Sequence, residues 1–138
     1  MSDGARRGLC AAGNWIIDHV KTVDTWPAEQ TLANIVAEDH GTGGSPYNVC
    51  IDLMKFGAPF PVSALGLVGD DADGAFIRND AERFGFDATH LRTLDGVSTS
   101  YTDVINVAST GRRTFFHHRG ANAHLAPEHF PVDALECR

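Results

Sequence analysis

Hydrophobic and polar residues follow one another along this chain with a period that changes from strand-like to helix-like and back. Residues 9–13 form a short apolar run that ends in glycine, which is typical of a strand buried on both faces. Residues 15–23 and 32–38 mix β-branched with polar side chains, and Trp26-Pro27 lies between them. These two segments predict a β-hairpin flap that is held less firmly than a core strand.

Residues 41–48 read Gly-Thr-Gly-Gly-Ser-Pro-Tyr-Asn and place a glycine turn directly before a helix start. Ser45 is a favoured N-cap, and Pro46 suits the first helical position, so a helix is predicted to begin at Ser45. It ends at Gly57. The i, i+4, i+7 spacing predicts a core-facing stripe made of Val49, Leu53 and Phe56.

The next blocks repeat the same order of strand and helix. Residues 62–68 predict a second buried strand, and the acid-rich turn at 69–74 opens a second helix. Its predicted C-cap is Gly85. Its inward face is predicted to consist of Phe76, Ile77, Ala81 and Phe84. Alternating strand and helix is the pattern of an α/β layer built on a parallel sheet.

Beyond the second helix the pattern becomes β-rich again. Residues 101–107 and 114–118 favour extended structure, and a Gly-containing turn separates them. They predict a second hairpin, which ends in the glycine-asparagine turn at 119–122.

The length, composition and net charge of the chain exclude several classes of function. A chain of 138 residues has the length of one domain, and its 43% hydrophobic and 21% charged residues are ordinary for a globular protein. The 11 basic and 18 acidic residues give a net charge of -7, which argues against a nucleic-acid-binding surface. We therefore expect a small molecule or a second copy of the chain as partner, and no run is long enough to cross a membrane.

The cysteines indicate the redox compartment. Cys10, Cys50 and Cys137 are an odd number of cysteines, spread too far apart for a zinc knuckle or a disulfide framework. A reducing, cytoplasmic location is the expectation that follows.

Two polar side chains are candidates for ligand binding. Asp18 follows Gly13 by five residues, and ligands of open α/β sheets collect beyond the carboxyl ends of the strands, so Asp18 is placed to accept hydrogen bonds from hydroxyls. Asn48 lies in the first turn of the first predicted helix, where free N–H groups and the helix dipole favour a polar, hydroxyl-rich or anionic ligand. An exposed loop acid and a plain surface asparagine are the structural alternatives for these two residues.

Metal and dinucleotide sites are weaker interpretations. The acids at 69–73 are explained by capping of the following helix, and adjacent histidines on a strand point to opposite faces, so no metal site is predicted. The histidines in question are His117, His118, His124 and His129. A dinucleotide fingerprint at 41–44 fails because its third glycine falls on Pro46.

Five motifs occur in one order along the chain. They are Gly13 with Asp18, Gly43-Gly44 with Asn48, Gly57, the run 65–71 with Gly74, and Gly120-Ala121-Asn122 with Leu125. In this order they resemble the N-terminal half of a PfkB, or ribokinase-like, carbohydrate kinase. The similarity extends from about residue 9 to about residue 130.

The resemblance implies a fold and a division of the chain. It implies a ribokinase-like α/β fold, with a three-layer α/β/α partial core on a parallel sheet, a β-hairpin lid, and the N-terminal portion only. Residues 1–138 then form the substrate-binding part, and the lid segments are about 15–38 and 98–118.

The resemblance also implies site residues and cofactors. The positions expected to bind sugar hydroxyls are Asp18, Gly43, Gly44 and Asn48, and those expected to contact substrate from the lid are Tyr101 and Arg113. ATP and Mg²⁺ serve the full-length enzyme and bind mostly to its C-terminal half. The catalytic aspartate belongs to a C-terminal Gly-Asp motif without a counterpart here, so this chain is expected to hold no catalytic residue and no tightly bound cofactor, and to be inactive alone.

The leading interpretation is therefore an ATP-dependent kinase of a sugar, polyol or nucleoside hydroxyl, to which this chain contributes the sugar-binding half and the lid. A non-catalytic ligand-binding module, or one that dimerises through its β-lid, is the alternative. A nicotinamide-binding fragment is a third.

Overall fold

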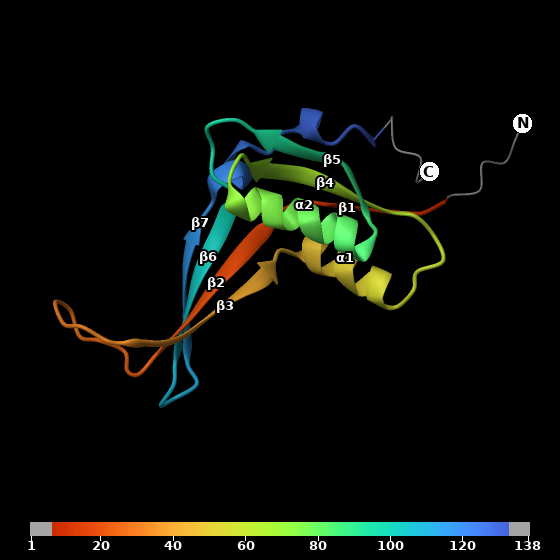
Figure 1. The fold of residues 1–138 in the computed structure, drawn as a ribbon. Helices are drawn as coiled ribbons and strands as arrows, with labels where there is room; N and C mark the ends of the chain where they lie inside the picture. Colours follow the sequence, from red (N-terminus) through yellow and green to blue (C-terminus); the bar gives the residue numbers. More distant parts are fainter. Residues whose placement is uncertain (1–6, 133–138) are drawn as a thin grey trace, which may run out of the picture.

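The computed structural model describes residues 7–132 and contains two sheets. The first is a parallel sheet in the order β1-β4-β5, formed by β1 (Leu9–Ala12), β4 (Val62–Gly69) and β5 (Asp87–Leu94). Helices α1 (Ser45–Lys55) and α2 (Ala72–Phe84) lie side by side along it (Figure 1). The short 3-10 helices η1 (Gly120–His124) and η2 (Pro127–His129) pack against β4. The predicted parallel α/β layer is confirmed.

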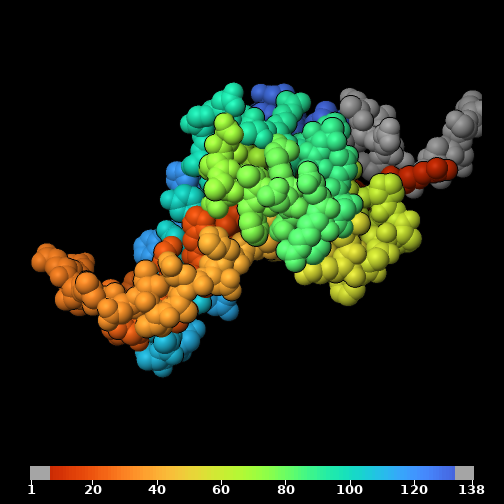
Figure 2. Space-filling model, in the orientation of Figure 1, coloured from red at the N-terminus to blue at the C-terminus, as the bar shows by residue number. Residues whose placement is uncertain are grey.

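The second sheet extends away from this layer (Figures 1 and 2), and we call it the projecting sheet. Its strands, in the order β3-β2-β6-β7, are β2 (Ile16–Val23), β3 (Ile35–Gly43), β6 (Ser100–Val107) and β7 (Arg113–His118). Both predicted hairpins are present, and the parallel pairing of β2 with β6 joins them into one sheet. The assignment of segments 15–38 and 98–118 as a lid stays a prediction.

Trp15 anchors the base of the projecting sheet in the core. Its side chain is fully buried, and its Nε1 donates a 2.8 Å hydrogen bond to the Leu65 carbonyl. Its ring lies 5.3 Å from the Tyr47 ring and 6.1 Å from the Phe86 ring. A Cβ on Gly66 would approach the Trp15 ring to 2.4 Å, so β4 needs a glycine beneath the indole.

The start of α1 differs from the prediction. The N-cap is Gly44, with φ at 88°, and Ser45 is the first helical residue, so the expected Ser45 cap is wrong. A Cβ on Gly44 would lie 2.0 Å from the Asn14 carbonyl oxygen, which explains why glycine holds this position. Gly41 and Gly43 belong to β3, so the expected glycine turn is mostly strand.

The buried face of α1 also differs from the prediction. Its buried residues are Pro46, Tyr47, Cys50 and Ile51. Val49 is 41% exposed and Phe56 is 88% exposed, whereas Leu53 is partly buried against the core. This helix has two possible apolar stripes at helical spacing. The stripe that begins at Tyr47 packs on the sheet, because the Tyr47 ring lies tilted against the Trp15 ring.

The cap and most of the buried face of helix α2 are as predicted from the sequence. Gly85 is its C-cap with φ at 85°, and Ile77 and Ala81 are buried as predicted, while Phe76 is 42% exposed. Strand β5 was not predicted. None of the helices between residues 7 and 132 is long and apolar enough to span a membrane.

The state of the cysteines differs from the expectation that they form no disulfide. Cys10 is disulfide-bonded, which the sequence reasoning did not anticipate. Cys50 carries a buried free thiol, and burial raises its pKa to about 11. Cys137 lies outside the described residues.

Candidate functional site

Asp18 lies on β2 near the base of the projecting sheet. It is opposite Gly41 of β3 on one side and Thr102 of β6 on the other. Its side chain is half-buried, and this burial raises its pKa, while nearby His117 and His19 partly offset the increase. A half-buried acid with a raised pKa on an open sheet face is a candidate for ligand binding.

Glycines of β3 make room for the Asp18 carboxylate. A Cβ on Gly43 would lie 2.8 Å from Asp18 Oδ1 and 3.2 Å from the Ile16 Cβ. Gly41 leaves ordinary space, because its Cβ would lie 3.5 Å from the Asp18 Cβ. The predicted site residues Asp18 and Gly43 are therefore brought together, with bare backbone beside the carboxylate.

The two glycines predict different mutational effects. Gly43→Ala is expected to displace the Asp18 carboxylate and to weaken ligand binding about 10-fold, since a loss of about 1–2 kcal/mol is typical of a misplaced charged hydrogen bond. Gly41→Ala is the matched control on the same strand and should leave affinity within about 2-fold, the scale expected for an ordinary van der Waals contact. Calorimetry of both variants measures the difference, and equal affinities would contradict a role for Gly43 in placing Asp18.

Thr102 and His117 lie on the other side of Asp18. The Thr102 hydroxyl and the His117 Nδ1 are 2.9 Å apart, and His117 is opposite Thr102 in the β6–β7 ladder. Residues directly opposite each other share a sheet face, so this pair faces the same side as Asp18. Sequence reasoning missed both residues as neighbours of Asp18, because only the parallel pairing of β2 with β6 brings them there.

The Asn48 side chain pairs with Thr42 of β3. The Thr42 hydroxyl donates a 2.6 Å hydrogen bond to Asn48 Oδ1. Thr42 is opposite Ile17, so the strand alternation turns it toward the face opposite Asp18. Asn48 borders a hollow of about 350 Å³ that α1 and α2 also line. Its role in binding sugar stays a prediction.

The two predicted lid contacts lie on different faces. Tyr101 precedes Thr102 and faces away from Asp18. Its ring stacks on His19 at 5.1 Å and lies tilted against His118 at 5.1 Å. Arg113 alternates with His117 along β7 and so shares the face of Asp18, where it is exposed. Both assignments stay predictions.

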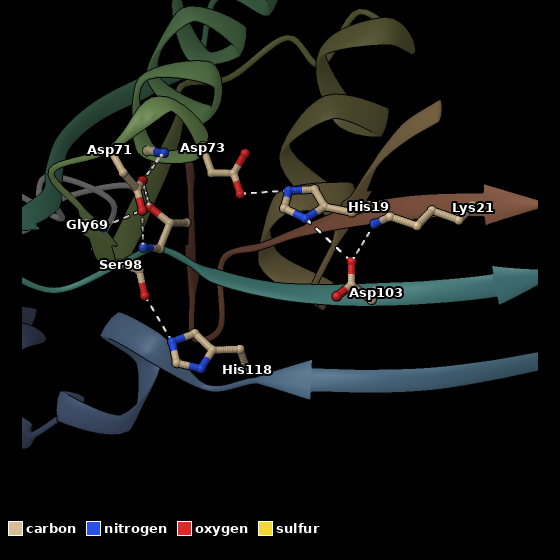
Figure 3. Close-up of polar contacts among 10 residues, drawn as sticks. His19, Lys21, Gly69, Asp71, Asp73, Ser98, Asp103 and His118 are labelled. Atoms are coloured by element: carbon tan, nitrogen blue, oxygen red, sulfur yellow. Dashed lines mark hydrogen bonds and ion pairs between the residues drawn. The ribbon is translucent and has the colours of Figure 1, made fainter. Parts of the chain in front are cut away.

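On the opposite face a polar network joins the projecting sheet to the α/β layer (Figure 3). His19 Nε2 lies 2.8 Å from Asp73 Oδ2 of α2, and Lys21 Nζ lies 2.7 Å from Asp103 Oδ1 of β6. The Ser98 hydroxyl and His118 Nε2 are 2.9 Å apart. His19 of β2 thus contacts the α2 start and His118 of β7 contacts the loop before β6, whereas the Lys21–Asp103 pair lies within the projecting sheet.

Asp71 fixes that loop. As the N-cap of α2, its Oδ1 accepts a 2.9 Å bond from the Gly74 N–H and a 2.6 Å bond from the Thr99 hydroxyl. Its Oδ2 accepts a 2.7 Å bond from the Thr99 N–H. The capping interpretation of these acids is supported, and residues 7–132 contain no group of three or more His, Cys, Asp or Glu side chains placed to hold a metal ion.

Comparison with known proteins identifies related sequences and structures. A family model described as the pfkB family carbohydrate kinase matches residues 6–138. A fructokinase from Klebsiella pneumoniae is 35% identical over 113 residues, which are 77% of this chain and 36% of that enzyme. The chain therefore spans little more than a third of that relative's length.

Solved structures show the same fold. A ribokinase from Thermotoga maritima superimposes with a TM-score of 0.83 at 20% identity, over 95% of this chain and 43% of that one. A ribokinase from Cryptococcus neoformans, solved in complex with ADP, gives a TM-score of 0.74 at 20% identity, over 88% of this chain and 36% of that one. These similarities confirm the predicted ribokinase-like α/β fold.

Proposed function

Because this chain belongs to the pfkB family of carbohydrate kinases, we propose that the full-length enzyme transfers the γ-phosphoryl group of ATP to a hydroxyl of a sugar, or of a related polyol or nucleoside. Residues 1–138 supply the sugar-binding half and the lid. The observation that carries this proposal is the half-buried Asp18 carboxylate, with its raised pKa, beside the bare backbone of Gly43. A carboxylate placed in this way accepts charge-assisted hydrogen bonds from a vicinal diol.

The remaining predicted site residues take supporting roles. Gly43 lets the backbone approach the sugar beside Asp18, and Gly44 turns the chain from there into α1. In this proposal Asn48 reaches the sugar past the bare backbone of Gly43 and Gly44, because its partner Thr42 lies on the other face of β3. Thr102 and His117 add polar groups on the Asp18 face, and the projecting sheet acts as a lid that excludes water before transfer.

ATP and Mg²⁺ belong to the proposal for the full-length enzyme. When bound, they supply the phosphoryl group and neutralise its charge. The described residues include no group of three or more His, Cys, Asp or Glu side chains placed to hold a metal ion, and the proposal assigns no residue of this chain to hold ATP or Mg²⁺. In this proposal the catalytic base and most of the ATP site lie outside these 138 residues, which are inactive alone.

Calorimetry of the full-length protein with a panel of sugars, sugar acids and nucleosides tests the proposal. We expect micromolar to millimolar binding of at least one member, followed by ATP-dependent phosphorylation, as is usual for metabolic enzymes. A folded protein that binds and phosphorylates no member of the panel would contradict the proposal.

A second candidate function is dimerisation through the projecting sheet. Its support is a set of exposed apolar side chains on the two faces of this sheet: Trp26 stacks 6.5 Å from Phe116, and Ile35, Val36 and Phe115 are also exposed. Sedimentation of the full-length protein and of its Phe116→Ser variant separates this candidate from a monomeric enzyme. The family match lends no support to the nicotinamide alternative.

A further inference from the structure

The contact between His19 and Asp73 joins the strand that carries Asp18 to the α/β layer. His19 Nε2 lies 2.8 Å from Asp73 Oδ2 in the first turn of α2 (Figure 3), and the two side chains are only 26% and 23% exposed. His19 is the residue directly after Asp18, and it faces the opposite side of β2. Any movement of His19 relative to α2 therefore moves Asp18.

Neighbours hold the His19 ring in one orientation. The ring stacks on Tyr101 at 5.1 Å with an interplanar angle of 22°, and His40 meets its edge at 5.4 Å. His19 Nδ1 lies 3.8 Å from Asp103 Oδ1. With the ring held from β3 and β6, Nε2 stays directed at Asp73.

This contact is also the outermost tie of β2 to the α/β layer. Trp15 and Ile17 are buried in the core at the strand base. Farther along, the polar contacts described for β2 stay inside the projecting sheet: Lys21 binds Asp103, and the Val23 carbonyl accepts from the Ala108 N–H. Among residues 7–132, the distal part of β2 pairs with β3 and β6 of its own sheet.

We propose that His19 and Asp73 are positioning residues, whose contact sets the angle of the projecting sheet on the α/β layer and thereby places the Asp18 carboxylate for substrate. This inference rests on the proposed function. Neither residue touches the sugar, because His19 faces away from Asp18 and Asp73 belongs to α2. Breaking the contact lets β2 and β3 pivot on the buried base formed by Trp15 and Ile17.

Two substitutions of Asp73 in the full-length enzyme separate the contact from the charge at the α2 start. Asp73→Ala removes both, whereas Asp73→Asn removes the charge but keeps an oxygen that accepts from His19 Nε2. We expect the KM for sugar to rise about 3- to 10-fold in Asp73→Ala and to stay within about 2-fold in Asp73→Asn, the scale of one hydrogen bond. The KM for ATP should not change in either variant.

Lys21→Gln is the matched control, because it breaks an ion pair of similar exposure, 29% and 35%, that lies entirely within the projecting sheet. It should leave the KM for sugar unchanged. Equal KM values for Asp73→Ala and Asp73→Asn, or an equal rise in Lys21→Gln, would overturn the inference.

Hydrogen exchange without sugar distinguishes failure of this inference from failure of the proposed function. Amides of residues 16–20 should exchange about 3- to 10-fold faster in Asp73→Ala than in Asp73→Asn, since local opening follows the free energy of the lost contact. If the protein phosphorylates no sugar but this difference in exchange appears, the proposed function is wrong, while the role of the His19–Asp73 contact in holding β2 is supported. If exchange is equal in both variants, the tie itself is wrong.

Discussion

Asp18→Asn in the full-length protein is expected to weaken sugar binding about 100-fold or more, while the thermal midpoint stays equal to or rises above that of the parent. Charge-assisted hydrogen bonds contribute about 1.5–3 kcal/mol each, and a carboxylate that holds a diol makes two of them. Asparagine keeps the shape of the side chain but loses the charge, and one of its two polar groups becomes a donor.

The expected gain in stability follows from the direction of the pKa shift. Burial raises the pKa of Asp18 above its ordinary value of 3.8, although His117 and His19 oppose the change. The folded state then binds the proton more tightly than the unfolded state, so stability falls as pH rises from 3.8 through the raised pKa. At neutral pH this penalty is fully present, and Asp18→Asn removes it.

Titration calorimetry measures the sugar affinity and differential scanning calorimetry measures the thermal midpoint, both at pH 7. Asp39→Asn is the matched control, because Asp39 is an exposed acid two positions beyond Gly41 on the same face of β3. It should change neither affinity nor midpoint. Sugar affinity that survives Asp18→Asn, or a midpoint that falls by several degrees, would show that Asp18 is a structural acid.

Local signals predicted most elements of the α/β layer correctly. Gly85 ends α2 in the left-handed region as expected, and the apolar run at 62–68 forms β4. The hydrophobic pattern did not predict strand β5, because only Leu91 of its eight residues is fully buried and its remaining side chains are mostly polar. Its position is set by parallel pairing with β4, a non-local interaction that no short sequence window contains.

Periodicity predicted the existence of α1 but not its buried face. The stripe with Val49 and Phe56 and the stripe with Tyr47 and Cys50 have the same helical spacing. Packing of the Tyr47 ring on Trp15 decides between them. The choice depends on a residue some thirty positions away, so the helical pattern alone cannot make it.

The candidate site likewise contains residues that the sequence predicts and residues that only the strand pairing reveals. Asp18 is a candidate from its place after the first predicted strand, Gly43 becomes one through the family resemblance, and the β2–β3 register brings the two together. Thr102 and His117 reach Asp18 only through the parallel β2–β6 pair. The same register separates Tyr101 from Asp18, because alternation along β6 sends neighbours to opposite faces.

Asp71→Ala is expected to lower the free energy of unfolding by about 3 kcal/mol, which corresponds to a midpoint about 5 °C lower in a full-length protein of roughly 310 residues, the length implied by the fructokinase relative. Asp71 accepts hydrogen bonds from the Gly74 N–H, the Thr99 N–H and the Thr99 hydroxyl. Thr99 is fully buried, so its N–H group loses its described partner and cannot recover one from water. Scanning calorimetry of the full-length protein measures the loss, and Asp70→Ala, which removes the exposed neighbouring acid, should cost less than about 0.5 kcal/mol.

The pH dependence of Asp71→Asn separates the charge from the helix cap. Burial on its own raises the pKa of Asp71, but the bonds from Thr99 and Gly74 outweigh it and hold the pKa below the ordinary 3.8. The carboxylate therefore stabilises the fold above pH 3.8, and this contribution is lost as pH falls through the lowered pKa. Asp71→Asn keeps an oxygen for the cap but turns its amide NH2, a donor, toward the Thr99 N–H, which is also a donor. Its loss of unfolding free energy should therefore be intermediate at pH 7 and should shrink below pH 3.8. A deficit that is independent of pH would mean that Asp71 acts only as a helix cap and that its charge does not hold the loop before β6.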